Sequence, residues 1–145
     1  MKFSIITVCF NSEKTIGRSI YSVCEQKHKD FEHIIIDGNS SDGTISIIEE
    51  LKHDKMKIVS EPDDGLYDAM NKGMRLCSGD IICILNSDDY YKNENVLTIV
   101  NDCFTSETDV VFGDVEFVKK KDTSWITRKI RPKKFKPWLL RFGWM

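Results

Sequence analysis

Short runs of β-branched and other apolar residues alternate along this chain with segments of helical spacing. The runs are Phe3–Val8, His33–Asp37, Lys57–Ser60 and Ile81–Leu85, each apolar almost throughout. Strands of parallel sheets show this pattern, because helices cover both faces of such a sheet. The alternation therefore predicts an α/β fold with a mostly parallel, doubly wound, Rossmann-like sheet and helices on both faces.

The segments between the runs carry apolar residues three and four positions apart, as amphipathic helices do. The residues predicted to face the core are Ile16, Ile20, Val23 and Cys24 in the first helix, Ile45, Ile48 and Leu51 in the second, and Leu66, Met70, Met74 and Cys77 in the third. A fourth helix is predicted within residues 95–104, and one or two further strands within residues 109–118.

Charge is distributed unevenly along the 145 residues. The formal net charge is −2, but residues 119–145 contain ten Lys or Arg and one acid, so they carry +9 and the preceding residues carry −11. This shift predicts a folded core over residues 1–118 and a basic, aromatic tail over residues 119–145.

Composition excludes several classes of protein. The chain is 41% hydrophobic, and it has no apolar run near the ~18 residues that span a bilayer. The N-terminal residues lack a cleavage site of the secretory kind. The odd number of cysteines and the absence of a C-x-x-C pair predict reduced thiols in a cytoplasmic protein, without a zinc site or disulfide framework; they are Cys9, Cys24, Cys77, Cys83 and Cys103.

Polar residues follow each of the four predicted strands. They are Asn11–Ser12, Asp37–Asp42, Glu61–Asp64 and Asn86–Asp89. In a parallel sheet the carboxyl ends of the strands lie along one edge, which is where ligands of doubly wound folds bind. We therefore expect these residues to form one site.

Asp88 and Asp89 are adjacent carboxylates at the end of a buried strand, where their like charges repel. Mg²⁺ or Mn²⁺ is commonly held by one or two carboxylates, with waters and substrate phosphates completing the shell. The pair therefore indicates a metal site. The alternative interpretation is a turn, in which one acid caps the next helix and the other faces solvent.

The other clusters have structural interpretations beside the functional ones. Ser41 or Asp42 is a natural N-cap for the second helix, whereas Asp37 stands at the strand's end and could accept a hydrogen bond from a base or ribose. A dinucleotide cofactor has little support, because no G-x-G-x-x-G follows a strand. Asn71 and Lys72 either project toward a nucleotide or form a solvated helix face.

Five blocks of this sequence, in order and spacing, resemble the successive blocks of family 2 glycosyltransferases, which have the GT-A nucleotide-sugar-binding fold. The blocks cover nearly the whole chain and read "ITVCFNSEKTIGRSIYSV", "IIIDGNSSDGT", "SEPDDGLYDAMNKG", "SGDIICILNSDD" and "VVFGDV". The resemblance implies that residues 1–118 form a nucleotide-sugar-binding core.

The resemblance also implies roles for single residues. Asp88 matches the family's metal-coordinating acid and Asp89 the acid after it, with Mg²⁺ or Mn²⁺ as cofactor. The nucleotide-sugar-binding residues that we predict are Cys9, Phe10, Asn11, Asp37, Glu61, Asn71, Lys72, Asn86 and Ser87.

Three departures from the family's pattern matter. Asn86 replaces the first acid of the D-x-D element, and Gly38 replaces the second acid of the D-D-G-S element. No acid here matches the family's catalytic base, which belongs to an acceptor-binding half that usually follows. We therefore predict no catalytic residue in this chain, and weak or absent transfer by this piece alone.

The resemblance implies a metal-assisted, inverting transfer from a nucleotide-diphosphate sugar, with UDP the favoured nucleotide, to a glycan or lipid-linked acceptor in polysaccharide biosynthesis. One alternative is a nucleotide-sugar-binding or assembly module without catalysis. A second is a nucleotidyltransferase, although "TVCFNSEKT" is no glycine-rich, basic phosphate loop.

The tail mixes basic residues with Phe135, Trp138, Leu139, Leu140 and Phe142. It either packs against the acceptor-binding half or lies on an anionic membrane surface, which would place the protein at the inner face of a membrane. Self-association through this tail is a further hypothesis. We expect no nucleic-acid partner, because the acidic core would repel a phosphate backbone.

Overall fold

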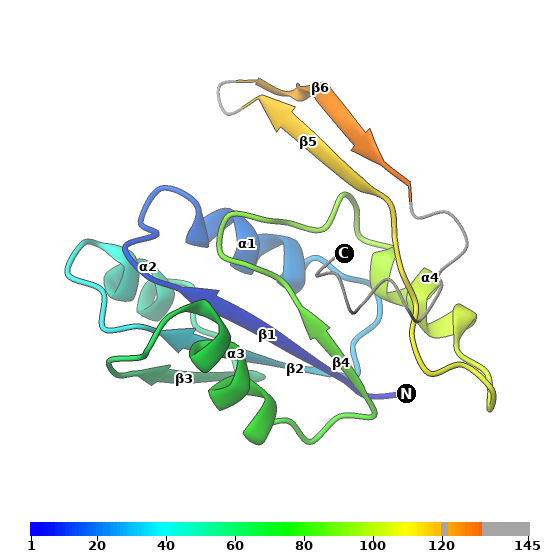
Figure 1. Cartoon of the computed structure of the whole chain (residues 1–145), viewed down its shortest axis with the longest axis horizontal. Helices are drawn as coiled ribbons and strands as arrows, with labels where there is room; N and C mark the ends of the chain where they lie inside the picture. The colour runs from blue at the N-terminus through cyan, green and yellow to red at the C-terminus, as the bar shows by residue number, and fades with distance from the viewer. Residues whose placement is uncertain (120–121, 132–145) are drawn as a thin grey trace. The chain divides into compact units, whose positions relative to one another are not determined.

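The computed structural model describes residues 1–119 and 122–131. These residues belong to two compact units, Met1–Asp102 and a second that starts at Cys103. The first unit holds a sheet of parallel strands in the order β3-β2-β1-β4 (Figure 1). The predicted mostly parallel α/β sheet is therefore confirmed.

The secondary structure follows the predicted alternation. The strands of the sheet are β1 (Phe3–Cys9), β2 (Phe31–Asp37), β3 (Met56–Ser60) and β4 (Ile81–Ile84). The helices are α1 (Ile16–Cys24), α2 (Thr44–Glu50), α3 (Leu66–Arg75) and α4 (Val96–Cys103). Every residue of β1 and β2 is buried, as expected for central strands that are covered on both faces.

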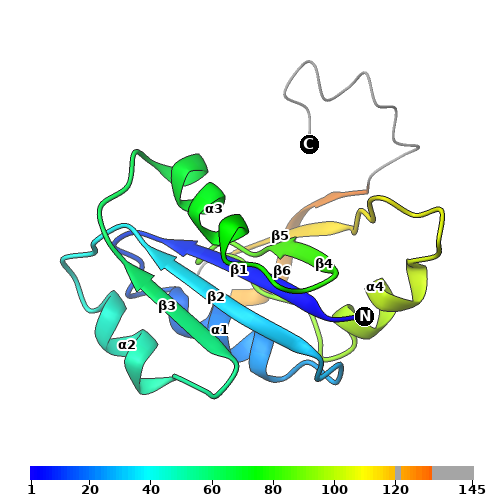
Figure 2. The same ribbon diagram turned by 90° about the horizontal axis from the view of Figure 1, so that it is seen from below.

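Helices lie on both faces of the sheet, as Figure 2 shows. On one face, Ile16 and Ile20 of α1 and Ile48 of α2 share an apolar cluster with Ile35 of β2. On the other face, Ala69 of α3 belongs to a second cluster; its strand residues are Ile6, Val8, Ile34 and Ile36. Burying these branched side chains on both sides of the sheet is the main favourable contribution to folding of this unit.

The apolar stripe predicted for α3 is confirmed at Met70 and Cys77, which pack against the second cluster, and is wrong at Leu66 and Met74. Leu66 and Met74 are 51% and 41% exposed, whereas Ala69 and Gly73 are buried. The helix lies so close to the sheet that a Cβ on Gly73 would come within 2.5 Å of Cγ2 of Ile6. Small residues therefore face the strands, and the larger apolar residues flank the contact. The prediction also fails at Leu51, which follows the last residue of α2 and is exposed.

The second unit contains an antiparallel pair, β5 (Val115–Lys119) and β6 (Asp122–Ile130). Residues 109–114, predicted to take part in a strand, form none. Residue 119, where the tail was predicted to start, is the last residue of β5, and the strand that pairs with β5 lies within the predicted tail. Its aromatic part, including Trp138 and Phe142, lies outside the described residues. No helix in the described ranges is both long and apolar enough to cross a membrane.

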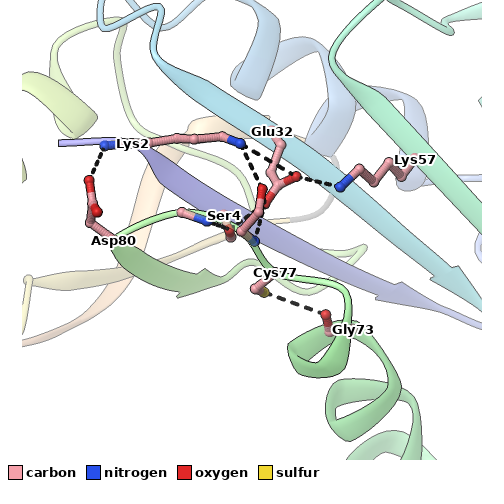
Figure 3. Close-up of polar contacts among 9 residues, drawn as sticks. Lys2, Ser4, Glu32, Lys57, Gly73, Cys77 and Asp80 are labelled. Carbon is pink, nitrogen blue, oxygen red and sulfur yellow. Dashed lines mark hydrogen bonds and ion pairs between the residues drawn. The ribbon is translucent and has the colours of Figure 1, made fainter.

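A buried carboxylate, Glu32, joins three strands and the turn before β4 (Figure 3). It accepts hydrogen bonds from Ser4 Oγ at 2.7 Å, Lys57 Nζ at 2.7 Å and the Ser78 amide at 2.6 Å. Lys2 Nζ lies 3.9 Å away. Burial alone would raise the pKa of Glu32, but the hydrogen bonds from Lys57, Ser4 and Ser78 outweigh it and lower this pKa from 4.5 to about 2.

We expect this carboxylate to make the fold sensitive to acid. Below pH 4.5 Glu32 becomes protonated in the unfolded chain, whereas in the folded chain it stays ionised down to about pH 2. The free energy of unfolding therefore falls between these two pH values. Glu32→Gln should lower stability near pH 6 and flatten its decline between pH 5 and pH 3. Urea unfolding followed by circular dichroism at several pH values measures both effects.

Glu50→Gln is the control for this prediction, since Glu50 is exposed at the end of α2. His33 contributes to the same acid sensitivity in all three proteins. Burial, and then the nearby His53, lower the pKa of His33 from 6.5 to about 3, so protonation of the unfolded chain also costs stability below pH 6.5. An unchanged slope in Glu32→Gln would show that Glu32 does not drive the loss.

Candidate functional site

The carboxyl ends of the strands are level with one another. Cys9 pairs with Asp37 across β1 and β2, and Asp37 pairs with Ser60 across β2 and β3. On the other side of β1, the Ser87 amide donates to the Val8 carbonyl at 3.3 Å. All four polar clusters therefore leave the sheet from the same edge.

The loops after β1 and β2 are hydrogen-bonded to each other. The Asn11 amide donates to Ser40 Oγ at 2.8 Å, and Asn11 Oδ1 accepts from the Ser41 amide at 2.9 Å. Asn11 has φ 48°, a left-handed conformation that asparagine tolerates better than most residues. Beside it, Phe10 is 63% exposed. The structure thus fixes the Asn11 side chain in the loop and leaves the Phe10 ring open at the edge.

Asp37 is fully buried and its carboxylate is surrounded by donors. Oδ1 accepts from Ser40 Oγ at 2.5 Å and lies 3.6 Å from Cys9 Sγ. Oδ2 accepts from the Ser40 amide at 3.0 Å and from Ser60 Oγ at 2.7 Å. Since a carboxylate has about four acceptor positions, this one is saturated. It joins the ends of β1, β2 and β3.

Cys9 is likewise part of the interior and not of the exposed edge. Its thiol donates to Asp37 and lies 3.7 Å from the Ile36 carbonyl. Burial, and then the charge of Asp37, raise the pKa of Cys9 far above its ordinary value of 9.0. The thiol is therefore held protonated as a donor to Asp37.

Asp42 organises the start of α2. Its Oδ1 accepts from the Thr44 amide at 3.0 Å, and Oδ2 accepts from the Glu13 amide at 3.2 Å. The hydrogen bond from the Thr44 hydroxyl is the largest cause of the lowered pKa of Asp42, and the bonds from these two amides lower it further. The N-cap of α2 is Gly43, so the prediction of Ser41 or Asp42 at that position is wrong, although Asp42 accepts hydrogen bonds beside the start of the helix.

Two residues predicted to bind nucleotide contact each other. Lys72 Nζ lies 3.0 Å from Glu61 and 3.3 Å from Asp68, and it donates to the Pro62 carbonyl at 2.8 Å. Hydrogen bonding to Glu61 is the largest cause of the raised pKa of Lys72. The pair connects the loop after β3 to α3. Asn71, the neighbouring predicted residue, is exposed.

The loop after β4 carries the two acids. Ser87 is buried, with its Oγ 2.9 Å from Ser12 Oγ, so this loop is joined to the loop after β1. Asn86 Oδ1 is buried without a hydrogen-bond partner in the described part of the chain. Asp88 and Asp89 are exposed. Desolvation, and then the charge of Asp88, raise the pKa of Asp89, and a hydrogen bond from Asn86 offsets part of this.

This donor set fits a hard divalent cation. Neither acid forms an ion pair with a lysine or arginine among residues 1–119 and 122–131. Within the same ranges no group of three or more His, Cys, Asp or Glu is placed to hold a metal. Two carboxylates are nevertheless the usual protein contribution to a Mg²⁺ site, because substrate phosphates and waters supply the rest.

The sequence placed most of the residues that hold this edge together in the predicted clusters, but it did not identify their hydrogen-bond partners. Ser12 bonds to Ser87 and Ser40 to Asn11 between loops, whereas Ser60 donates to Asp37 between the ends of two strands. Asp63 lies against Gly38. The available signal was weak: short hydroxyl side chains in turns are common, and nothing in their spacing shows which distant carboxylate they meet.

Comparisons with known proteins agree with this geometry. The family model described as "Glycosyl transferase family 2" matches residues 4–144. A protein of Mycobacterium tuberculosis named as an uncharacterized glycosyltransferase is 37% identical over 95 residues, which are 65% of this chain and 36% of that protein.

Similar solved structures include two with bound nucleotide sugars. Residues 1–349 of TarS from S. aureus, in complex with UDP-GlcNAc, match with a TM-score of 0.66 and 28% identity over 70% of this chain and 30% of that one. The mannosyltransferase PcManGT from Pyrobaculum calidifontis, in complex with GDP-Man and Mn²⁺, matches in fold with a TM-score of 0.69 and 21% identity, over 85% and 37% of the two chains. This chain thus spans about a third of the length of each of these proteins. It belongs to glycosyl transferase family 2.

Proposed function

We propose that this chain is the donor-binding part of a metal-assisted, inverting glycosyltransferase. It would bind a nucleoside-diphosphate sugar, with UDP the favoured nucleotide, for transfer to a glycan or lipid-linked acceptor. The proposal rests on one observation: Phe10, the loop after Asp37 and the Asp88–Asp89 pair all lie at the same edge of the sheet. TarS, which is 28% identical, has been solved with UDP-GlcNAc and with UDP, and this supports uridine here.

The charge of the bound donor explains the two exposed acids. As the bond from the sugar to the diphosphate breaks, negative charge develops on the leaving phosphate oxygen. Asp88, together with Asp89, would hold Mg²⁺ or Mn²⁺, which supplies Lewis-acid stabilisation of that charge. Desolvation and the charge of Asp88 both raise the pKa of Asp89, and a cation bound by the two carboxylates would offset both effects.

The proposal assigns different roles to the two parts of the chain. Residues 1–118 form the nucleotide-sugar-binding core of the proposal, and residues 119–145 lead toward an acceptor-binding half that supplies the general base for the attacking hydroxyl. The +9 charge of residues 119–145 supports a further part of the proposal, which is peripheral contact with an anionic membrane surface. The apolar and aromatic residues of the same segment support another, which is self-association.

Calorimetric titration of the chain with UDP, in the presence and absence of Mn²⁺, tests this function. We expect saturable binding with Mn²⁺ and much weaker binding without it. Bound ligand should also raise the free energy of unfolding, by about 2.7 kcal/mol when its concentration is 100 times Kd. If UDP, GDP, CDP and ADP all fail to bind in the presence of Mn²⁺, the chain is not a donor-binding unit.

A further inference from the structure

The edge of the sheet has an exposed aromatic ring but no obvious acceptor for a nucleobase. Asp37, predicted to contact the base, is fully buried, and four donor groups occupy its carboxylate. A hydrogen bond to a ligand would have to displace one of these donors. Another residue must therefore contact the base.

Asp63 is the acidic residue placed for this role. A Cβ built on Gly38 would lie 2.6 Å from Asp63 Oδ2 and 3.4 Å from Cδ2 of Phe10. The missing side chain at residue 38 thus leaves a space that the Asp63 carboxylate enters from the loop after β3, beside the ring of Phe10. The charge of Asp63 contributes to the raised pKa of Cys9, which agrees with this position.

The two oxygens of Asp63 differ in their contacts. Oδ1 accepts a hydrogen bond from the Gly65 amide at 2.8 Å, which fixes the orientation of the carboxylate. Oδ2 accepts no hydrogen bond from any residue in the described ranges, and the side chain is only half-buried. Asp63 therefore offers one oriented acceptor next to an open aromatic ring.

We propose that Asp63 is a specificity-determining residue that accepts a hydrogen bond from the imino N–H of the donor's nucleobase, while the base lies on Phe10. The inference rests on the proposed function. Uracil (at N3) and guanine (at N1) carry such an N–H on the ring edge that would face Asp63. Cytosine and adenine present a ring nitrogen lone pair there, which a carboxylate repels. An acceptor that is covered by the bound base and meets the wrong partner there produces strong discrimination.

Asp63→Asn tests this role because the amide is close in shape to the carboxylate. Its NH₂ group can donate to the ring nitrogen of cytosine. We expect the wild-type chain, with Mn²⁺, to bind UDP at least about tenfold more tightly than CDP. The variant should reduce this ratio about tenfold or more, by weakening UDP and strengthening CDP. Calorimetric Kd values for the two nucleotides give the ratio directly.

Asp64→Asn is the matched control, since it makes the same change one residue away on an exposed acid. Its UDP to CDP ratio should equal that of the wild type. Phe10→Ala should weaken both nucleotides by similar factors, because stacking does not depend on the ring edge. GDP and ADP form a second pair, in which GDP is expected to bind more tightly.

The outcomes separate this inference from the proposed function. If the wild type binds UDP with Mn²⁺ and Asp63→Asn keeps the wild-type UDP to CDP ratio, Asp63 does not recognise the base, although the chain still binds a donor. If the wild type binds none of the four nucleotides, both the inference and the proposed function are wrong.

Discussion

Replacing Asp88 by alanine is expected to abolish the Mn²⁺-dependent part of UDP binding. Asp88 is exposed at the end of β4 and has no neutralising partner in the described parts of the chain, so its charge is available to a cation. Loss of residues that merely orient a metal ligand weakens metal binding roughly 10- to 100-fold. Loss of the ligand itself should cost at least as much. Calorimetry with UDP at fixed Mn²⁺ measures the effect.

Asp54→Ala is a suitable control, since Asp54 is also an exposed acid but lies in the turn before β3, at the opposite end of the sheet. A second measurement needs no nucleotide. Asp88 is the second cause of the raised pKa of Asp89, so Asp88→Ala should lower that pKa, as observed by NMR titration of the Asp89 carboxyl carbon. Equal Mn²⁺ dependence in the wild type and in Asp88→Ala would remove Asp88 from the metal site.

The strands and their shared edge could be predicted because they depend on the residue pattern within each short segment. Strands buried on both faces must be apolar throughout, and β1 and β2 are entirely buried. The turns that follow must be polar because their backbones are not paired in the sheet. Parallel pairing then brings the carboxyl ends together whatever the details of the helices. The position of the site thus follows from hydrophobic runs and chain order alone.

The roles of residues within the site depend on packing between distant segments. Ser60, which is 23 residues after Asp37, supplies one of its donors, and no periodicity signals such a pair. Packing also determines which face of α3 is turned to the sheet. The helix lies so close to the strands that only the small residues Ala69 and Gly73 fit between them, and Leu66 and Met74 are left exposed. Similarly, residues 109–114 have strand-like composition but no partner strand in the described structure, and composition alone does not form a strand.

Asp37→Ala should have the largest effect on stability of any substitution at this edge. It removes the acceptor from Ser40, Ser60 and Cys9 together. Two hydroxyls and a thiol can rotate toward other acceptors, but the Ser40 amide cannot. Leaving this partly buried donor unpaired costs up to about 1–3 kcal/mol, and the ends of three strands lose their common anchor. We expect a loss of about 3 kcal/mol or more in urea unfolding, against about 1 kcal/mol for Ser60→Ala, which removes one of these bonds.

Nucleotide preference in Asp37→Ala distinguishes an internal anchor from a ligand contact. An anchor positions the edge as a whole, so the folded fraction at low temperature should bind UDP more weakly but keep a UDP to CDP ratio near that of the wild type. If Asp37 were a ligand contact, the opposite result would be expected. The free energy of unfolding would change by less than about 0.5 kcal/mol, as for an ordinary surface substitution, and the preference for UDP would be lost. The four short contacts around a fully buried carboxylate favour the first result.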